Sequence, residues 1–168
     1  MFPESMLLEE AFEDPVTFGR NNSSRISRLV DTADLSLRDF DSAREEINSA
    51  LNAEDPWQRY WALIVLSSFG EQANIYAQRA NDIAQSDDEN LVRLRAIEFL
   101  ALIGRENPSQ LLPALLISAA NEVEATIILN TAVLLRDFTE YDIQIDSEMI
   151  PLSLTGPQRL NIERRLCC

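Results

Sequence analysis

The amino-acid sequence predicts an all-α fold: a short array of helical hairpins that ends in an irregular C-terminal extension. Apolar residues recur at helical spacing along most of the chain, and one stretch nearly repeats itself. Residues 55–70 (DPWQRYWALIVLSSFG) match residues 89–104 (ENLVRLRAIEFLALIG) at a separation of 34 residues. A fixed period of this length is typical of stacked helical hairpins, because one hairpin cannot bury its own apolar face.

Length and composition indicate one soluble domain of 168 residues with a real core. All of its basic residues are arginine, since the chain contains neither histidine nor lysine. It therefore lacks the usual proton shuttle near neutral pH, the commonest metal ligand and the Schiff-base nucleophile. We expect a chain that is not an enzyme by itself and that uses no cofactor and no metal. A small enzyme that acts through carboxylates alone is the least favoured alternative.

The net charge of −14 disfavours partners that carry phosphate. Nucleic acids and anionic membrane surfaces need a basic face on the protein. No apolar run reaches the length of a membrane-spanning helix, and the first residues lack the basic region of an export signal. We therefore expect no nucleic-acid partner, no membrane insertion and no signal peptide in this chain.

Residues 1–40 are predicted to form an N-terminal helical cap or linker. Residues 4–13 place apolar side chains at helical spacing, and Asp14-Pro15 ends this first helix. A polar loop follows, and a second short helix is expected over residues 24–33.

Residues 41–138 are predicted to form three hairpins. Asp41 is expected to cap the first helix, and Asp55-Pro56 starts the second, because proline is well tolerated at the first helical position. The expected helix pairs are 41–51 with 56–70, 71–86 with 89–103, and 109–120 with 122–138. The remainder, 139–168, is expected to be extended from Tyr141 and to close with a helix over 158–166.

The residues that the two copies share predict which side chains face the stack. Ala62 and Leu66 recur as Ala96 and Leu100, at the i, i+4 spacing of one helix face. The alanines set how closely paired helices approach, and a glycine closes each copy.

The shared arginines predict a ladder of ion pairs. Arg59 and Arg93 lie in the first turn of their helices, which is unfavourable for a cation. We expect an acidic partner in a neighbouring turn, Asp55 or Asp88. The alternative is that both arginines are simply solvated.

One stripe differs between the copies and predicts a contact surface. Trp57, Trp61 and Ile64 correspond to Leu91, Arg95 and Glu98. The second copy is expected to show a charged surface there, whereas tryptophans are typical of buried contacts between surfaces. Either residues 1–40 cover the tryptophan stripe or another domain does, and cover by residues 1–40 is favoured.

The repeat resembles HEAT-like repeats, which build an α-α superhelix. More specifically, residues 55–63 (DPWQRYWAL), 91–104 (LVRLRAIEFLALIG) and 128–137 (ILNTAVLLRD) look like the C-terminal HEAT-like region of certain bacterial sulfatases. The family's nucleophile motif does not carry over: its nearest match is residues 155–159 (TGPQR), and threonine is not converted to formylglycine.

The resemblance implies a non-catalytic accessory domain that packs against a sulfatase catalytic domain, in cis or in trans. The parent enzyme would then be exported to the periplasm or secreted. The contact would be made by the Trp57, Trp61 and Ile64 stripe or by the degenerate third hairpin. The alternative is a free-standing helical-repeat adaptor that binds another protein.

Overall fold

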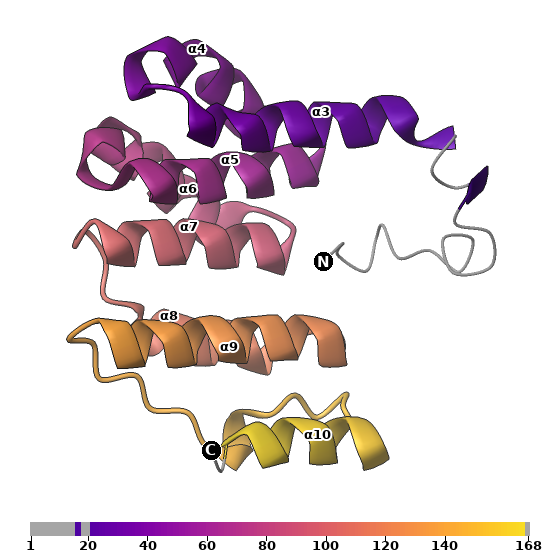
Figure 1. Cartoon of the computed structure of the whole chain (residues 1–168). Coiled ribbons are helices and arrows are strands. Elements are labelled where there is room, and N and C mark those ends of the chain that lie inside the picture. The colour runs from indigo at the N-terminus through magenta and orange to yellow at the C-terminus, as the bar shows by residue number, and fades with distance from the viewer. Residues whose placement is uncertain (1–15, 18–20, 167–168) are drawn as a thin grey trace. The chain divides into compact units, whose positions relative to one another are not determined.

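The computed structural model describes residues 16–17 and 21–166, and in these residues helix dominates and no strand occurs (Figure 1). The predicted all-α class is confirmed. The helix expected over residues 4–13 lies outside the described residues. None of the described helices combines the length and the apolar character that a bilayer crossing requires.

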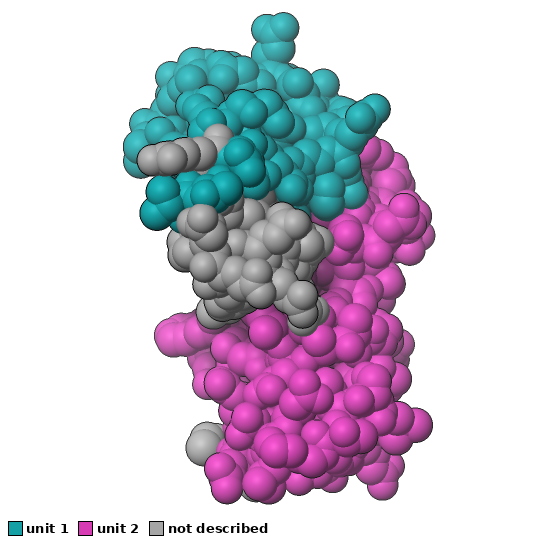
Figure 2. Space-filling model, turned by 90° about the vertical axis from the view of Figure 1, so that its right-hand side faces the viewer, with its two compact units in different colours: residues 1–76 teal, residues 77–168 magenta. Residues whose placement is uncertain are grey.

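The chain is divided into two compact units, residues 1–76 and residues 77–168 (Figure 2). The division falls within the stretch 71–86, which was expected to be one helix. This stretch begins instead as a 3-10 helix, η2 (Gly70–Tyr76), and becomes an α-helix only at α6 (Ala77–Ser86).

The first unit is built around one central helix. In chain order its elements are α3 (Ser23–Asp34), the 3-10 turn η1 (Leu35–Leu37), α4 (Phe40–Leu51) and α5 (Pro56–Phe69). Both α3 and α4 pack against α5. The side chains buried in this unit include Leu29, Leu35, Ile47, Leu51, Leu63 and Leu66.

The residue that caps α4 differs from the prediction. Asp39, not Asp41, has the extended backbone of a cap, and its carboxylate accepts a hydrogen bond from the Ser42 N–H at 3.0 Å. Asp41 lies in the first turn, where a negative charge is still favourable. The helix begins earlier than predicted because Phe40 is drawn into the core, where it is 9% exposed.

The second unit contains two helix pairs and a closing helix. Helix α6 packs against α7 (Asn90–Leu102), and α8 (Pro108–Ile117) packs against α9 (Glu122–Phe138). A 3-10 turn, η3 (Ser147–Met149), precedes α10 (Gly156–Leu166). Helix α9 contacts both α7 and α10 and lies between them in Figure 1. The expected pairing of helices is observed, whereas their superhelical stacking stays a prediction.

The extension after α9 is irregular, as predicted, but it is packed. Residues 141–146 form no helix. The hydroxyl of Tyr141 donates to the carbonyl of Ala101 on α7 at 3.1 Å. Ile143, Ile150 and Leu154 are each at most 3% exposed. The extension therefore contributes side chains to the core of the second unit.

The glycine that closes each copy has a backbone reason. Gly70 has φ +55° and Gly104 has φ +66°, a region that side chains with a Cβ rarely adopt. After Gly104, the Arg105 N–H donates back to the carbonyl of Leu100 at 2.8 Å and so closes α7. The repeated glycine thus ends a helix in both units.

Candidate functional site

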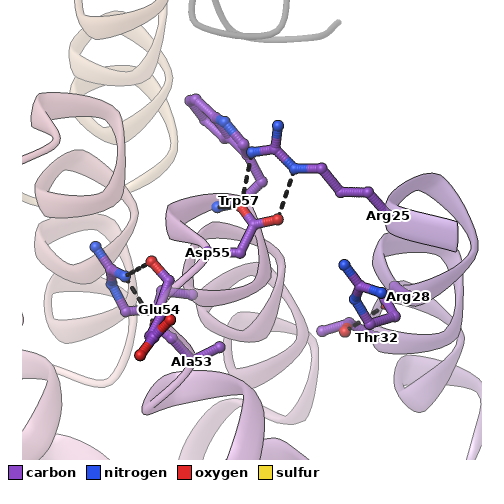
Figure 3. A network of polar contacts seen from close by, with 8 residues as sticks. Arg25, Arg28, Thr32, Ala53, Glu54, Asp55 and Trp57 are labelled. Carbon is purple, nitrogen blue, oxygen red and sulfur yellow. Dashed lines mark hydrogen bonds and ion pairs between the residues drawn. The ribbon is translucent and has the colours of Figure 1, made fainter. Parts of the chain in front are cut away.

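The N-terminus of α5 holds the most strongly bound carboxylate among those predicted as site residues. Asp55 precedes the helix with extended backbone, and its side chain accepts from the Trp57 N–H at 3.0 Å, as an N-cap does. Arg25 of α3 binds the same carboxylate through two nitrogens, at 2.6 and 2.9 Å (Figure 3). This bidentate pair joins α3 to the start of α5.

The surroundings of Asp55 favour its charged form. Burial by itself would raise the pKa of the carboxyl group. The hydrogen bonds from Arg25 and from the Trp57 N–H, with the positive charges of Arg25 and Arg28, outweigh burial and hold the pKa below its ordinary value. The hydrogen bond to Asp55 in turn raises the pKa of Arg25. Asp55 is thus a structural anion that is ionised at neutral pH, not a group poised for proton transfer.

The two shared arginines bind backbone carbonyls. Arg59 donates to the carbonyls of Ala53 and Glu54, at 2.8 and 3.0 Å, in the loop before α5. Arg93 donates to the carbonyl of Ala84, at 3.1 Å, in the last turns of α6. The Ala84 carbonyl lies near the C-terminus of α6, where a cation is favourable, and this offsets the unfavourable position of Arg93 in its own helix. The two carbonyls bound by Arg59 lie in a loop.

The acidic ladder is therefore not what the structure shows. Asp55 is held by Arg25, which lies in the segment that was expected only to cover the stripe. Asp88 makes no hydrogen bond or ion pair within the part of the chain that the structure describes, so the predicted pair with Arg93 is wrong. Each shared arginine instead links its helix to the end of the preceding segment.

The predicted interface residues do not form one open patch. Trp57 is 2% exposed, while Trp61 and Ile64 are half-buried. The ring of Tyr60 stands edge-on to both tryptophans, with centroid distances of 5.5 Å to Trp57 and 6.1 Å to Trp61. Since α3 packs on α5, Trp57 belongs to the core of its unit. Residues 4–13, which belong to the segment expected to cover the stripe, lie outside the described residues.

The corresponding stripe of α7 is not an open charged surface either. Arg95 and Glu98 form an ion pair, and their side chains are only 15% and 20% exposed. Leu91 is 6% exposed. The two polar residues of the second copy therefore pair with each other and are largely covered, so they present no open charged surface.

An exposed apolar face occurs on α9, in the third hairpin. Leu134 is 53% exposed and Phe138 is 82% exposed, and their i, i+4 spacing places them on one side of the helix. Leu134 lies 34 residues beyond Leu100, which is 2% exposed, and 68 beyond Leu66, which is fully buried. The repeat thus predicts a core position at Leu134, and the structure exposes it.

The sequence contained a signal for this face. The third hairpin was expected to be degenerate: Phe138 replaces the glycine that closes the earlier copies, whereas Leu134 keeps the repeated leucine and gave no signal of its exposure. Arg25 had no comparable signal, because its partner lies 30 residues away. Within the described residues, no group of three or more Cys, Asp or Glu side chains is placed to hold a metal ion.

Comparisons of the chain with family models, with curated proteins and with solved structures found no match.

Proposed function

We propose that this chain is a non-catalytic accessory domain that binds another protein through the exposed face of α9. The observation that carries the proposal is the exposure of Leu134 and Phe138 at positions that follow the repeat. Neighbouring exposed apolar side chains on a helix are typical of contact surfaces, and aromatic residues supply much of the binding energy there.

The charges of the chain support a binding role over catalysis. No histidine or lysine is present to move protons near neutral pH. The carboxylate with the strongest interactions, Asp55, is used to join two helices. The second unit supplies a helical scaffold with exposed apolar side chains on α9, which supports the proposal of an accessory binding domain.

The partner that the sequence resemblance favours is the catalytic domain of a sulfatase. Part of that resemblance, residues 128–137, lies on α9 and includes Leu134. The alternative partner is an unrelated protein, in which case the chain is a free-standing adaptor. Both partners would use the same face and differ only in their identity.

The direct test is co-expression with the sulfatase catalytic domains encoded in the same genome, followed by size-exclusion chromatography with light scattering. We expect a stoichiometric complex with the wild-type chain. The double variant Leu134→Asp, Phe138→Asp should lose it, because two charges would replace the apolar contact. Leu152→Asp is the matched control, since Leu152 is 91% exposed but lies in the C-terminal extension.

Two outcomes separate the candidate functions. If no sulfatase domain binds, but cross-linking in the native host joins another protein to α9 and the double variant loses it, the adaptor function holds. If the double variant keeps every partner of the wild-type chain, the α9 face is not the docking site and the proposal fails.

A further inference from the structure

The second unit contains a cavity of about 440 Å³ beside α9, a volume that is typical of small-molecule sites. It lies among α9, the irregular segment that follows it and the end of α10. The apolar part of its lining comes from Leu129, Ala132, Val133, Ile143, Ile145 and Leu166. Leu134 and Phe138 do not line it, so the cavity is distinct from the proposed docking face.

The charged groups around this cavity are mostly basic. Arg136, Asp137 and Arg165 contribute to its lining. The Arg136 Nε donates to Asp137 at 2.9 Å, so these two charges largely compensate each other. Arg165 is exposed and has no ion-pair partner among residues 16–17 and 21–166. The cavity thus carries one uncompensated positive charge in a chain whose net charge is −14.

Helix electrostatics explain only part of this arrangement. Arg136 and Arg165 lie in the last turns of α9 and α10, where cations are favourable. That preference does not require both arginines to line the same cavity. Their convergence there is the observation that suggests a ligand.

We propose that the cavity binds a small organic monoanion with an apolar body, of the class of medium-chain carboxylates. The hydrocarbon part would lie against Val133, Ile145 and Leu166, which are half-buried, and the carboxylate would accept hydrogen bonds from Arg165. Asp137 and the acidic surroundings disfavour ligands with several negative charges. This binding activity goes beyond the proposed docking function and does not depend on it.

Isothermal titration calorimetry of the full chain with octanoate tests the proposal. We expect saturable binding of one octanoate, and much weaker binding of 1-octanol and octyltrimethylammonium, which lack the negative charge. Arg165→Gln should weaken octanoate binding about tenfold, since hydrogen bonds to a charged group contribute substantially. Arg164→Gln is the matched control and should leave the affinity unchanged, because Arg164 does not line the cavity.

A second variant tests the location. Val133→Phe should narrow the cavity and weaken octanoate binding while Leu134 and Phe138 stay unchanged. If Val133→Phe does not fold, Arg165→Gln still decides the question, because Arg165 is exposed and its replacement leaves the core intact. The proposal is overturned by the absence of saturable binding, by equal affinity for 1-octanol, or by equal losses in Arg164→Gln and Arg165→Gln.

Discussion

Residues 55–70 and 89–104 use the same inner residues but different outer ones. Ala62 and Ala96 are fully buried in their respective units, and a glycine of positive φ ends each copy. The outer stripe holds Trp61 and Ile64 in the first copy and an ion pair in the second. The residues shared by the two copies are therefore those that pack between paired helices. The residues that differ are those whose surroundings differ between the two units.

The N-termini of α5 and α7 also differ between the two copies. Asp55 caps α5 and binds Arg25, whereas Glu89 precedes α7 and makes no side-chain cap hydrogen bond. Arg59 and Arg93 nevertheless serve alike, each donating to a carbonyl of the preceding segment. The two copies thus keep the arginine–carbonyl contact and differ in the cap at the start of the helix.

The largest expected loss of stability is at Trp57 and at Leu91, which occupy the same position in the two copies. Trp57→Ala should lower the free energy of unfolding by about 3–5 kcal/mol, and Leu91→Ala by about 2–5 kcal/mol, because both side chains are buried. Both tryptophans of the chain lie in the first unit, so in the Leu91 variant their fluorescence reports the first unit and circular dichroism reports both. If Trp57→Ala unfolds at the wild-type urea midpoint, the assignment of Trp57 to the core is wrong.

The next effect concerns the helix N-termini. Asp55→Ala removes a cap and the partner of Arg25, and should lower the free energy of unfolding by about 1–3 kcal/mol. The matched change Glu89→Ala should stay within about 0.5 kcal/mol, since no cap bond is lost. Equal losses in urea titrations of the two variants would contradict the difference between the two copies.

The same carboxylate predicts a pH dependence. Because the pKa of Asp55 is lowered in the folded chain, its contribution is present above the ordinary aspartate value of about 4 and is lost as the pH falls further. Asp55→Asn should flatten the decline of stability below about pH 4, since asparagine can still cap the helix but does not titrate. Urea midpoints measured from pH 7 to pH 2 check this, and parallel curves would count against it.

The glycines provide a smaller effect. Gly70→Ala and Gly104→Ala should each lower the free energy of unfolding by about 1–2 kcal/mol through backbone strain alone, because a Cβ would meet no atom within 4 Å. Asparagine should be better tolerated than alanine at position 104, where the closing bonds fit a left-handed residue. At Gly70 the ψ of −129° lies outside the left-handed helical region that asparagine tolerates, so Gly70→Asn should be as destabilising as Gly70→Ala. Thermal melts of the four variants decide this.

The smallest effect is expected at the ion pair of the second copy. Glu98→Leu and Arg95→Met each leave a half-buried charge without this partner, whereas the double variant removes both charges. The double-mutant cycle should give a coupling of about 1 kcal/mol, so the double variant is less destabilised than the sum of the singles. Additive losses in urea titrations would indicate that the pair does not stabilise α7.

Local signals in the sequence located most helices. The bounds predicted for the last helix of the third hairpin, 122–138, agree with those of α9, and Asp55-Pro56 marked the start of α5. The stretch 71–86 and the cap at Asp41 were less well predicted. In both, the local pattern allows a regular α-helix from the predicted start, and burial of Phe40 and Tyr76 accompanies the different geometry.

Local sequence patterns were enough to predict the all-α class, the copied helix faces and the glycines that end them, because these depend on backbone preferences and on periodicity within a few residues. Only the folded chain shows that Arg25 holds Asp55, that Trp57 is buried while Leu134 is exposed, and that Arg165 lines a cavity. These features join residues that are distant in the chain, or depend on what covers a helix face, and no local pattern specifies either.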